Sequence, residues 1–297
     1  VSNKLRKMTL EKKHNLTGWA FLAPATFLIA VFSFWPMIKA LVLSFQTGKG
    51  RNMQMAGFTN YIRMFQDDVF IQSIKNTFFY FILQVPIMLV VAMVLACILN
   101  KKDLRFKGFF RTMIFLPCTT SLVAYSIIFR SLFANDGLVN YVLVNLGILD
   151  KPYNFLTQPF AAKMVILLGL LWRWTGYNMV FFLSGLQNIE YSVYEAAKID
   201  GASAIQTFFK ITVPLLKPTI LLTAIMSTNG TLQLFDESIN LTDGGPANAS
   251  ISMSHYIYNL CFKYVPNFGY AAAMSFFILL LVAVLAFIQM RVGDKRD

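Results

Sequence analysis

Several polar side chains fall inside stretches that are otherwise apolar enough to cross a membrane. Asn229, Gln233 and Glu237 recur every four residues, so a continuous helix would present them on one face. Because polar groups are costly inside a bilayer, such a face should line a cavity or contact a partner. Two interpretations of Asn229 and Gln233 stay open: they line a path for a hydroxyl-rich solute, or they are polar packing groups between helices.

A second group of polar and aromatic residues lies in the preceding apolar stretch. Aromatic rings can stack on the apolar face of a ring-shaped solute, and amides can hydrogen-bond hydroxyl groups. The group consists of Trp172, Arg173, Trp174, Tyr177 and Asn178. Taking both groups together, the residues predicted to line a solute pathway are Arg173, Trp174, Tyr177, Asn178, Asn229, Gln233, Asp236 and Glu237.

Arg173 requires a partner of its own, because an unpaired guanidinium in a bilayer is costly. Asp236 and Glu237 lie toward the outer end of the next apolar stretch and are candidates for an ion pair. An anionic solute is a second candidate. Snorkelling to the interface, or pairing with another subunit, is the third.

Enzymatic chemistry has little support. His14 and His255 are isolated, and no Ser-His-Asp or paired-carboxylate constellation is visible in the sequence. No Gly-x-x-x-x-Gly-Lys-Ser/Thr sequence is present, so the chain has no phosphate-binding loop of that type. Three dispersed cysteines indicate small apolar fillers rather than a disulfide framework. We expect no enzymatic activity, no metal and no cofactor in this chain.

The amino-acid composition is typical of an integral membrane protein. Of 297 residues, 57% are hydrophobic and 13% are charged, about half the usual charged share of a soluble domain. The formal charge of +12 lies in short basic tracts between apolar runs, which does not favour nucleic-acid binding.

Six apolar stretches are long enough to span a bilayer, which needs about 20 residues each. We therefore predict an all-α polytopic membrane protein, in which Pro24, Pro36 and Pro86 produce kinks. The predicted spans are approximately 18–45, 74–99, 109–133, 161–186, 218–235 and 270–290.

The distribution of Lys and Arg between the loops sets the orientation. A roughly twofold excess in alternate segments favours both termini in the cytoplasm. The first apolar run is too long for a secretory signal and is expected to remain as a span. The predicted organisation is a basic cytoplasmic N-terminus (1–17), a single membrane-spanning domain (18–291) and a cytoplasmic tail (292–297).

A cytoplasmic loop, residues 187–217, joins the fourth and fifth spans. Good helix formers predict one short helix over Tyr191–Asp200, with Gly201 as its stop, and a second over Ala202–Thr212. Ala196 and Ala197 give a small surface that could lie in a groove of another protein. Glu195 and Asp200 add charges that a basic partner could meet.

This loop resembles the EAA loop of binding-protein-dependent ABC importer permeases. The family pattern is Glu-Ala-Ala, three residues, Gly, nine residues, Ile, one residue, Leu-Pro. Here it reads Glu195-Ala196-Ala197, Gly201, Ile211 and Val213-Pro214, with Val in place of Leu. The stretches 172–178 and 241–246 resemble the maltose-like carbohydrate class, although Gly244-Gly245-Pro246 also fits a simple turn.

The resemblance implies an assembly in a bacterial cytoplasmic membrane. A second homologous permease, two ATP-binding subunits that hold ATP and Mg, and an extracytoplasmic solute-binding protein would be the partners. They would act on a sugar or oligosaccharide, and Arg173 leaves an acidic one open. The implied coupling residues are Tyr194, Glu195, Ala196, Ala197, Asp200, Gly201 and Ala202.

The main alternative is a secondary solute carrier, or half of one, with no ATPase partner. The chain shows no clear internal repeat, which weakens that interpretation. A channel would not need a docking loop, and a membrane enzyme would need a reactive constellation.

Overall fold

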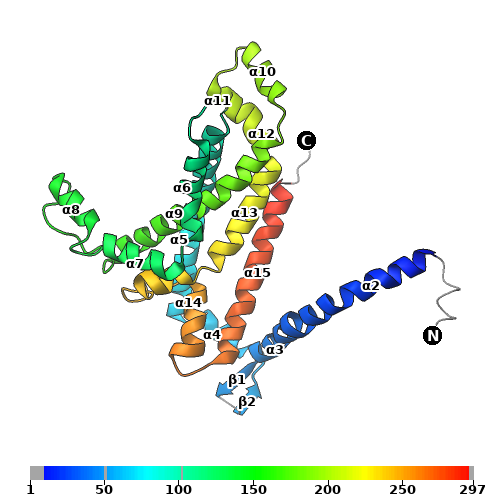
Figure 1. Ribbon diagram of the computed structural model, residues 1–297. Coiled ribbons are helices and arrows are strands. Elements are labelled where there is room, and N and C mark those ends of the chain that lie inside the picture. Colours follow the sequence, from blue (N-terminus) through cyan, green and yellow to red (C-terminus); the bar gives the residue numbers. More distant parts are fainter. Residues whose placement is uncertain (1–9, 50–51, 102, 294–297) are drawn as a thin grey trace.

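The computed structural model describes residues 10–49, 52–101 and 103–293. Most of the predicted basic N-terminal segment, the end of the predicted tail and Lys102 lie outside the described residues. Helices make up most of the described chain, and two short strands accompany them (Figure 1).

The first predicted span forms a helix that stands away from the other helices (Figure 1). It consists of α2 (Leu10–Ile29), the π-helical turn η1 (Ala30–Phe34) and α3 (Trp35–Ser44). The widened turn η1 ends two residues before Pro36, which has no N–H to donate to a regular helix. Of these three parts, α3 packs on the last helix, α15 (Phe268–Gly293). In its most apolar part this span buries nothing within the chain.

A hairpin that the sequence did not indicate follows the first span. Strand β1 (Gln46–Lys49) pairs antiparallel with β2 (Asn52–Met55), and α4 (Thr59–Met64) comes next. Asn60 connects α4 to the end of α3 and to β1, because its side-chain amide donates to the carbonyl oxygens of Ser44 and Gln46 at 2.9 and 2.8 Å. The close approach of Gly269 to the Gln46 carbonyl leaves no room for a side chain on α15 there.

The core of the fold is the packing of α5 (Asp68–Asn100) against α9 (Pro159–Gln187). Small and apolar residues such as Ala92, Ala96 and Phe182 are fully buried between them. Helix α5 begins earlier than predicted because Asp67 caps it, its side chain accepting from the amides of Val69 and Phe70.

The third predicted span, 109–133, is wrong as one straight helix. Helix α6 (Lys107–Thr119) and helix α7 (Leu122–Leu132) meet at an angle of 98°. Thr120 and Ser121 adopt extended backbone angles between them. The hydroxyls of Thr119 and Thr120 both donate to the Leu116 carbonyl oxygen, and such side-chain bonds compete with helical ones. Helix α8 (Leu138–Asn145) follows at the edge of the molecule (Figure 1).

The predicted loop contains α10 (Tyr191–Ile199), close to the predicted helix. The predicted second helix, Ala202–Thr212, is divided into α11 (Ala204–Thr207), η2 (Phe208–Thr212) and α12 (Val213–Leu215). It starts at Ala204 because Ser203 caps it in a capping box with Gln206. Segment 204–215 makes an angle of 71° with α13 (Lys217–Leu232).

Helix α13 ends at Leu232, three residues before the predicted end of the fifth span. The chain continues through η3 (Ser238–Thr242), α14 (Met253–Tyr258) and η4 (Asn259–Lys263) before α15. Among the described residues, four helices are long and apolar enough to span a membrane, and up to six if each bent pair counts as one span.

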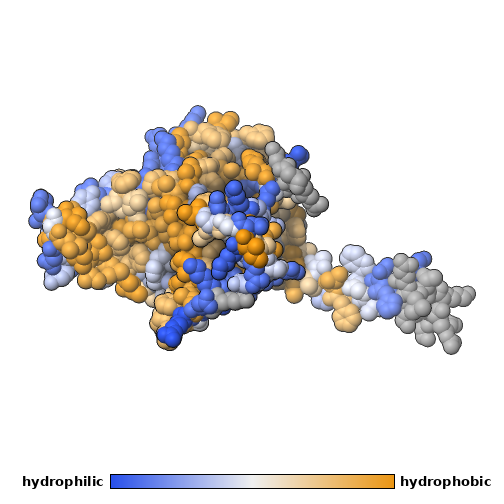
Figure 2. Space-filling view, turned by 90° about the horizontal axis from the view of Figure 1, so that it is seen from above, coloured by the Kyte–Doolittle hydropathy of each residue, from blue (hydrophilic) through white to orange (hydrophobic). Residues whose placement is uncertain are grey.

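The surface agrees with a membrane location. Seen from the end that carries α10, hydrophilic residues gather over the centre and hydrophobic residues cover much of the surrounding surface (Figure 2). All three cysteines, Cys97, Cys118 and Cys261, are free.

Candidate substrate cavity and coupling helix

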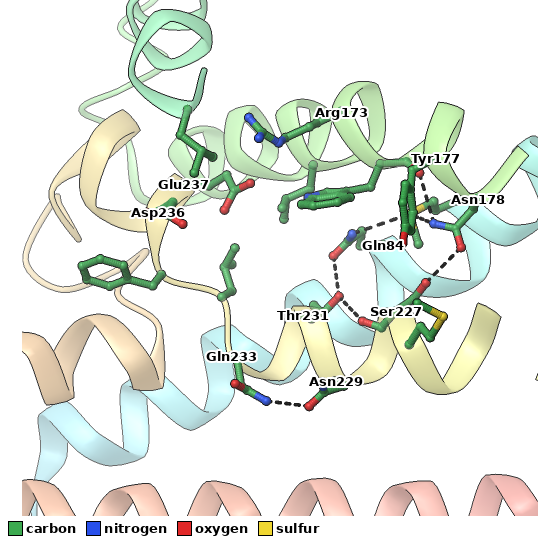
Figure 3. Close-up of a pocket in the computed structure, with 18 residues that line it drawn as sticks. Gln84, Arg173, Tyr177, Asn178, Ser227, Asn229, Thr231, Gln233, Asp236 and Glu237 are labelled. Atoms are coloured by element: carbon green, nitrogen blue, oxygen red, sulfur yellow. Dashed lines mark hydrogen bonds between the residues drawn. The ribbon is translucent and has the colours of Figure 1, made fainter. Parts of the chain in front are cut away.

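A cavity of about 430 Å³ lies between α9, α13 and the start of η3, with contributions from α5 and α7 (Figure 3). Its lining includes every residue predicted for the solute pathway, from Arg173 on α9 to Glu237 before η3. Aromatic rings, amides, hydroxyls and charges therefore meet in one space. Their role in transport remains a prediction.

Hydrogen bonds between three helices form one wall of this cavity. The Thr231 hydroxyl donates to the Gln84 side-chain oxygen at 2.8 Å, which connects α13 to α5. The Ser227 hydroxyl donates to the Asn178 side-chain oxygen at 3.3 Å, which connects α13 to α9. Sequence reasoning missed Gln84. A glutamine two residues before Pro86 in a long apolar run was the available signal.

Asn229 and Gln233 lie at the boundary between two cavities. Gln233 donates a side-chain hydrogen bond to Asn229, and the pair also lines a second cavity of about 570 Å³ near α15, with Ser254 and Ser275. Figure 3 shows both amides on the opposite side of α13 from Tyr177. The predicted single helix face through Asn229, Gln233 and Glu237 is wrong, because α13 ends at Leu232.

Arg173 is 93% buried, and no acidic residue in the described part of the chain lies within ion-pair distance of it. Its guanidinium lies 5.6 Å from the ring centre of Tyr125 and 5.4 Å from that of Trp174. No ion pair within 4.0 Å joins it to Asp236 or Glu237, and its Nε and Nη1 atoms have no hydrogen-bond partner among the residues that the structure describes. The prediction of a direct ion pair to either acid is therefore not met. Glu237, also buried, interacts with Arg173 electrostatically from a longer distance.

The residues of the Glu-Ala-Ala motif divide between two faces of α10. Ala197 is only 6% exposed, and the Tyr194 hydroxyl lies 3.5 Å from the Thr212 hydroxyl, so both face the rest of the chain. Glu195 and Ala196 are exposed. Ile199 is 85% exposed, so the described residues leave most of this large apolar side chain uncovered.

Gly201 ends α10 as predicted. Its φ of +74° is a left-handed conformation that favours glycine. The Ala202 amide donates to the Ala197 carbonyl oxygen at 2.9 Å and the Gly201 amide to that of Lys198 at 3.2 Å. These two bonds are a Schellman motif, which satisfies the last carbonyls of the helix and fixes the direction of the chain after it. Asp200, just before Gly201, is exposed.

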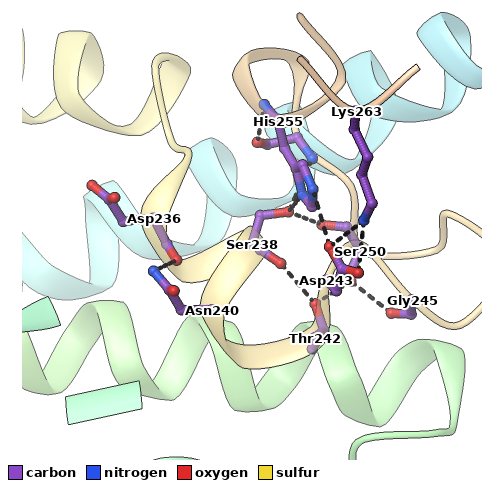
Figure 4. Close-up of polar contacts among 10 residues, drawn as sticks. Asp236, Ser238, Asn240, Thr242, Asp243, Gly245, Ser250, His255 and Lys263 are labelled. Atoms are coloured by element: carbon purple, nitrogen blue, oxygen red, sulfur yellow. Dashed lines mark hydrogen bonds and ion pairs between the residues drawn. The ribbon is translucent and has the colours of Figure 1, made fainter. Parts of the chain in front are cut away.

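The segment after α13 contains a buried polar network that sequence reasoning did not find (Figure 4). The Ser238 hydroxyl lies 2.9 Å from Nδ1 of His255, and Asp243 lies 3.6 Å from Nε2 of the same ring. Ser238 is fully buried and also donates to the Ser250 carbonyl oxygen. A substrate cannot reach this serine, so the arrangement stabilises the segment rather than supplying a nucleophile. Burial, opposed by Asp243, lowers the pKa of His255.

Sequence comparison decides the family. The family model described as "Binding-protein-dependent transport system inner membrane component" matches residues 12–296. The chain belongs to this family. This family membership gives no support to the alternative of a secondary carrier without an ATPase.

Individual relatives agree with this assignment. The lactose transport system permease protein LacF of Rhizobium radiobacter is 51% identical over 292 residues, 98% of each chain. The arabinooligosaccharides transport system permease protein AraP of Halalkalibacterium halodurans is 31% identical, over 96% of this chain and 90% of the relative. A bacterial alginate ABC transporter, solved in complex with an alginate pentasaccharide-bound periplasmic protein, has a chain with a TM-score of 0.84. That chain is 25% identical, with 96% of each chain covered.

Proposed function

We propose that this chain is one of two permease subunits of an ATP-driven importer that carries a sugar across a bacterial cytoplasmic membrane. The 51% identity to a lactose permease over nearly the whole of both chains carries this proposal. The cavity supports it, because its lining combines aromatic rings with amides and hydroxyls. Those groups suit a ligand that has both apolar ring faces and many hydroxyls.

The chain supplies the pathway, and its partners supply energy and delivery. A second homologous permease completes the pathway, two ATP-binding subunits hydrolyse ATP, and an extracytoplasmic binding protein delivers the sugar. The exposed face of α10, with Glu195, Ala196 and Ile199, docks on one ATP-binding subunit. The inward face, with Tyr194 and Ala197, transmits the movement to the spans that flank the loop.

The cavity wall gives that movement a route to the substrate. Segment 204–215 follows α10 and leads at an angle into α13. Helix α13 carries Ser227 and Thr231, which hydrogen-bond α9 and α5 across the cavity wall. A displacement of α13 therefore changes the width of the cavity and the hydrogen-bonding groups that a sugar meets there.

Uptake into proteoliposomes tests the proposal. The permease pair, the ATP-binding subunits and the binding protein are reconstituted, and radiolabelled lactose is the first probe because LacF is named for it. Uptake should require ATP on the ATP-binding-subunit side and the binding protein on the other side. Sugar accumulation that continues without ATP would contradict the proposal. Failure to carry any of a panel of mono- and disaccharides under these conditions would also contradict it.

A further inference from the structure

We propose that Arg173 and Glu237 form an open charge pair that a neutral sugar bridges through adjacent hydroxyl groups. The inference rests on the proposed function and deepens it, since it names the two residues that select the class of sugar. Both side chains line the 430 Å³ cavity, from α9 and from the segment between α13 and η3 (Figure 3).

The first argument is the unsatisfied hydrogen-bonding capacity of Arg173. Its side chain is 93% buried, and Nε and Nη1 have no partner among the described residues. Buried donors without a partner are strongly disfavoured, so native sites that keep them present them to a ligand or to water. Here the guanidinium borders a cavity that is large enough for a sugar ring.

The second argument is the position of Glu237. Its carboxylate is 96% buried and senses the charge of Arg173, but it is not within 4.0 Å of the guanidinium. Trp174 and the backbone of Glu237 already interact with this carboxylate, but Arg173 makes no hydrogen bond to it, so the buried guanidinium is the group left without compensation for desolvation. A hydroxyl can accept from one group and donate to the other, so two adjacent hydroxyls restore hydrogen bonds to both at once.

The third argument is the rigidity of the guanidinium. The rings of Tyr125 and Trp174 lie near it, at 5.6 and 5.4 Å. Tyr125 itself is fixed against α9, where Gly169 has no side chain and leaves space for its hydroxyl. Contacts with two rings restrict the guanidinium and favour one orientation of its planar fork of donors, which lysine cannot reproduce.

The charge balance of the cavity selects against an acidic sugar. Its charged lining residues are Arg173, Asp236 and Glu237, one positive and two negative. The carboxylate of a uronic acid would have to compete with two acidic side chains for the one guanidinium. A cationic amino sugar would be repelled by the positively charged guanidinium of Arg173. A neutral sugar meets donors and acceptors without repulsion.

The test measures lactose carried per ATP hydrolysed in the reconstituted importer. Three variants separate recognition from internal charge balance. Arg173→Lys keeps the charge but removes the planar donors. Glu237→Gln removes the acid. The double variant Arg173→Gln/Glu237→Gln removes both charges and keeps the side-chain sizes similar. Asp136→Asn, on the exposed loop before α8, is the matched control.

The expected result is a loss of about tenfold or more in lactose carried per ATP for Arg173→Lys and for the double variant. The double variant should carry no more lactose per ATP than the worse of the two single variants, and Asp136→Asn should carry as much as wild type. Wild-type behaviour of Arg173→Lys, or restoration of transport in the double variant, would overturn the proposal. Either outcome would mean that the two groups only balance each other.

Substrate choice provides a second arm. The wild-type importer should carry lactose faster than an alginate disaccharide at equal concentration, and faster carriage of the acidic sugar would overturn the inference. If wild type carries no sugar at all, the proposed function itself fails. If wild type carries lactose and the variants equal it, only the role of Arg173 and Glu237 fails.

Discussion

The Tyr270 hydroxyl donates a 2.7 Å hydrogen bond to Oδ2 of Asp67, a residue 203 positions away. The Tyr256 hydroxyl donates to the same oxygen at 2.6 Å, while Oδ1 of Asp67 caps α5. One carboxylate therefore joins the start of α5 to α14 and to the start of α15. Burial opposes ionisation of Asp67, yet the hydrogen bonds from the two tyrosines and the helix amides lower its pKa.

Replacing this carboxylate should destabilise the outer part of the protein. Hydrogen bonds to a charged group contribute about 1.5–3 kcal/mol each. Asp67→Asn keeps the helix cap but weakens both tyrosine bonds, so we expect a lower free energy of unfolding in thermal denaturation of the purified protein. Tyr256→Phe and Tyr270→Phe should each have part of this effect. Tyr258→Phe, on the same helix as Tyr256, is the control, and an equal loss there would refute the assignment.

The network around His255 should make the segment 238–263 sensitive to acid. The pKa of His255 is lowered by burial and by Lys263, and Asp243 only partly opposes this shift. The unfolded segment therefore binds the proton more readily, with a pKa near 6.5. The stability that neutral His255 gives to the folded segment is fully present above about pH 6.5. It is lost as the pH falls through the lower pKa that His255 has in the folded state.

Amide hydrogen exchange between pH 7.5 and 5 measures this loss. After correction for the intrinsic rate, residues 251–263 should exchange faster at the lower pH. His255→Gln should remove that pH dependence, and His14→Gln on exposed α2 should keep it. The same pH dependence in His255→Gln would assign the effect to another group.

The exposed face of α10 should bind the ATP-binding subunit. Ala196→Arg adds a large charged side chain on that face, so we expect loss of co-purification with the ATP-binding subunit while membrane insertion stays normal. Ala197→Arg is a poorer test than the motif alone indicates, because Ala197 is buried and its replacement also disturbs α10. Asp136→Arg, on the exposed loop before α8, is the control. Normal co-purification of Ala196→Arg would remove this face as the docking site.

The orientation in the membrane gives a further prediction. In a background where Cys97, Cys118 and Cys261 are replaced by Ala, Ile199→Cys should react with an impermeant maleimide only from the cytoplasm. Ala247→Cys, on the loop after η3, should react only from the outside. Labelling of both from one side would exclude the proposed topology.

Local signals allowed the first helix of the loop 187–217 to be predicted closely. The α10 helix and its end depend on neighbours in the sequence, since the Schellman motif at Gly201 uses only residues 197–202. The polar residues of the cavity could also be chosen from sequence, because polar side chains are rare in apolar stretches and must be buried together.

Interruptions of helices, and contacts between residues far apart in the sequence, could not be predicted in the same way. Hydropathy does not show that Thr120 and Ser121 leave the helix, nor that α13 ends at Leu232. Gln84 was missed because its partner, Thr231, is 147 positions away. The gap between Arg173 and Glu237 depends on the packing of several elements, which residue spacing does not determine.

ATP hydrolysis by the reconstituted importer tests the central claim most directly. The rate is measured in proteoliposomes with no binding protein, with sugar-free binding protein and with lactose-loaded binding protein. Binding-protein-dependent import through this permease predicts severalfold faster hydrolysis with the loaded binding protein, and loss of that stimulation in Ala196→Arg. A hydrolysis rate that is the same in all three conditions, while lactose still enters, would contradict the account.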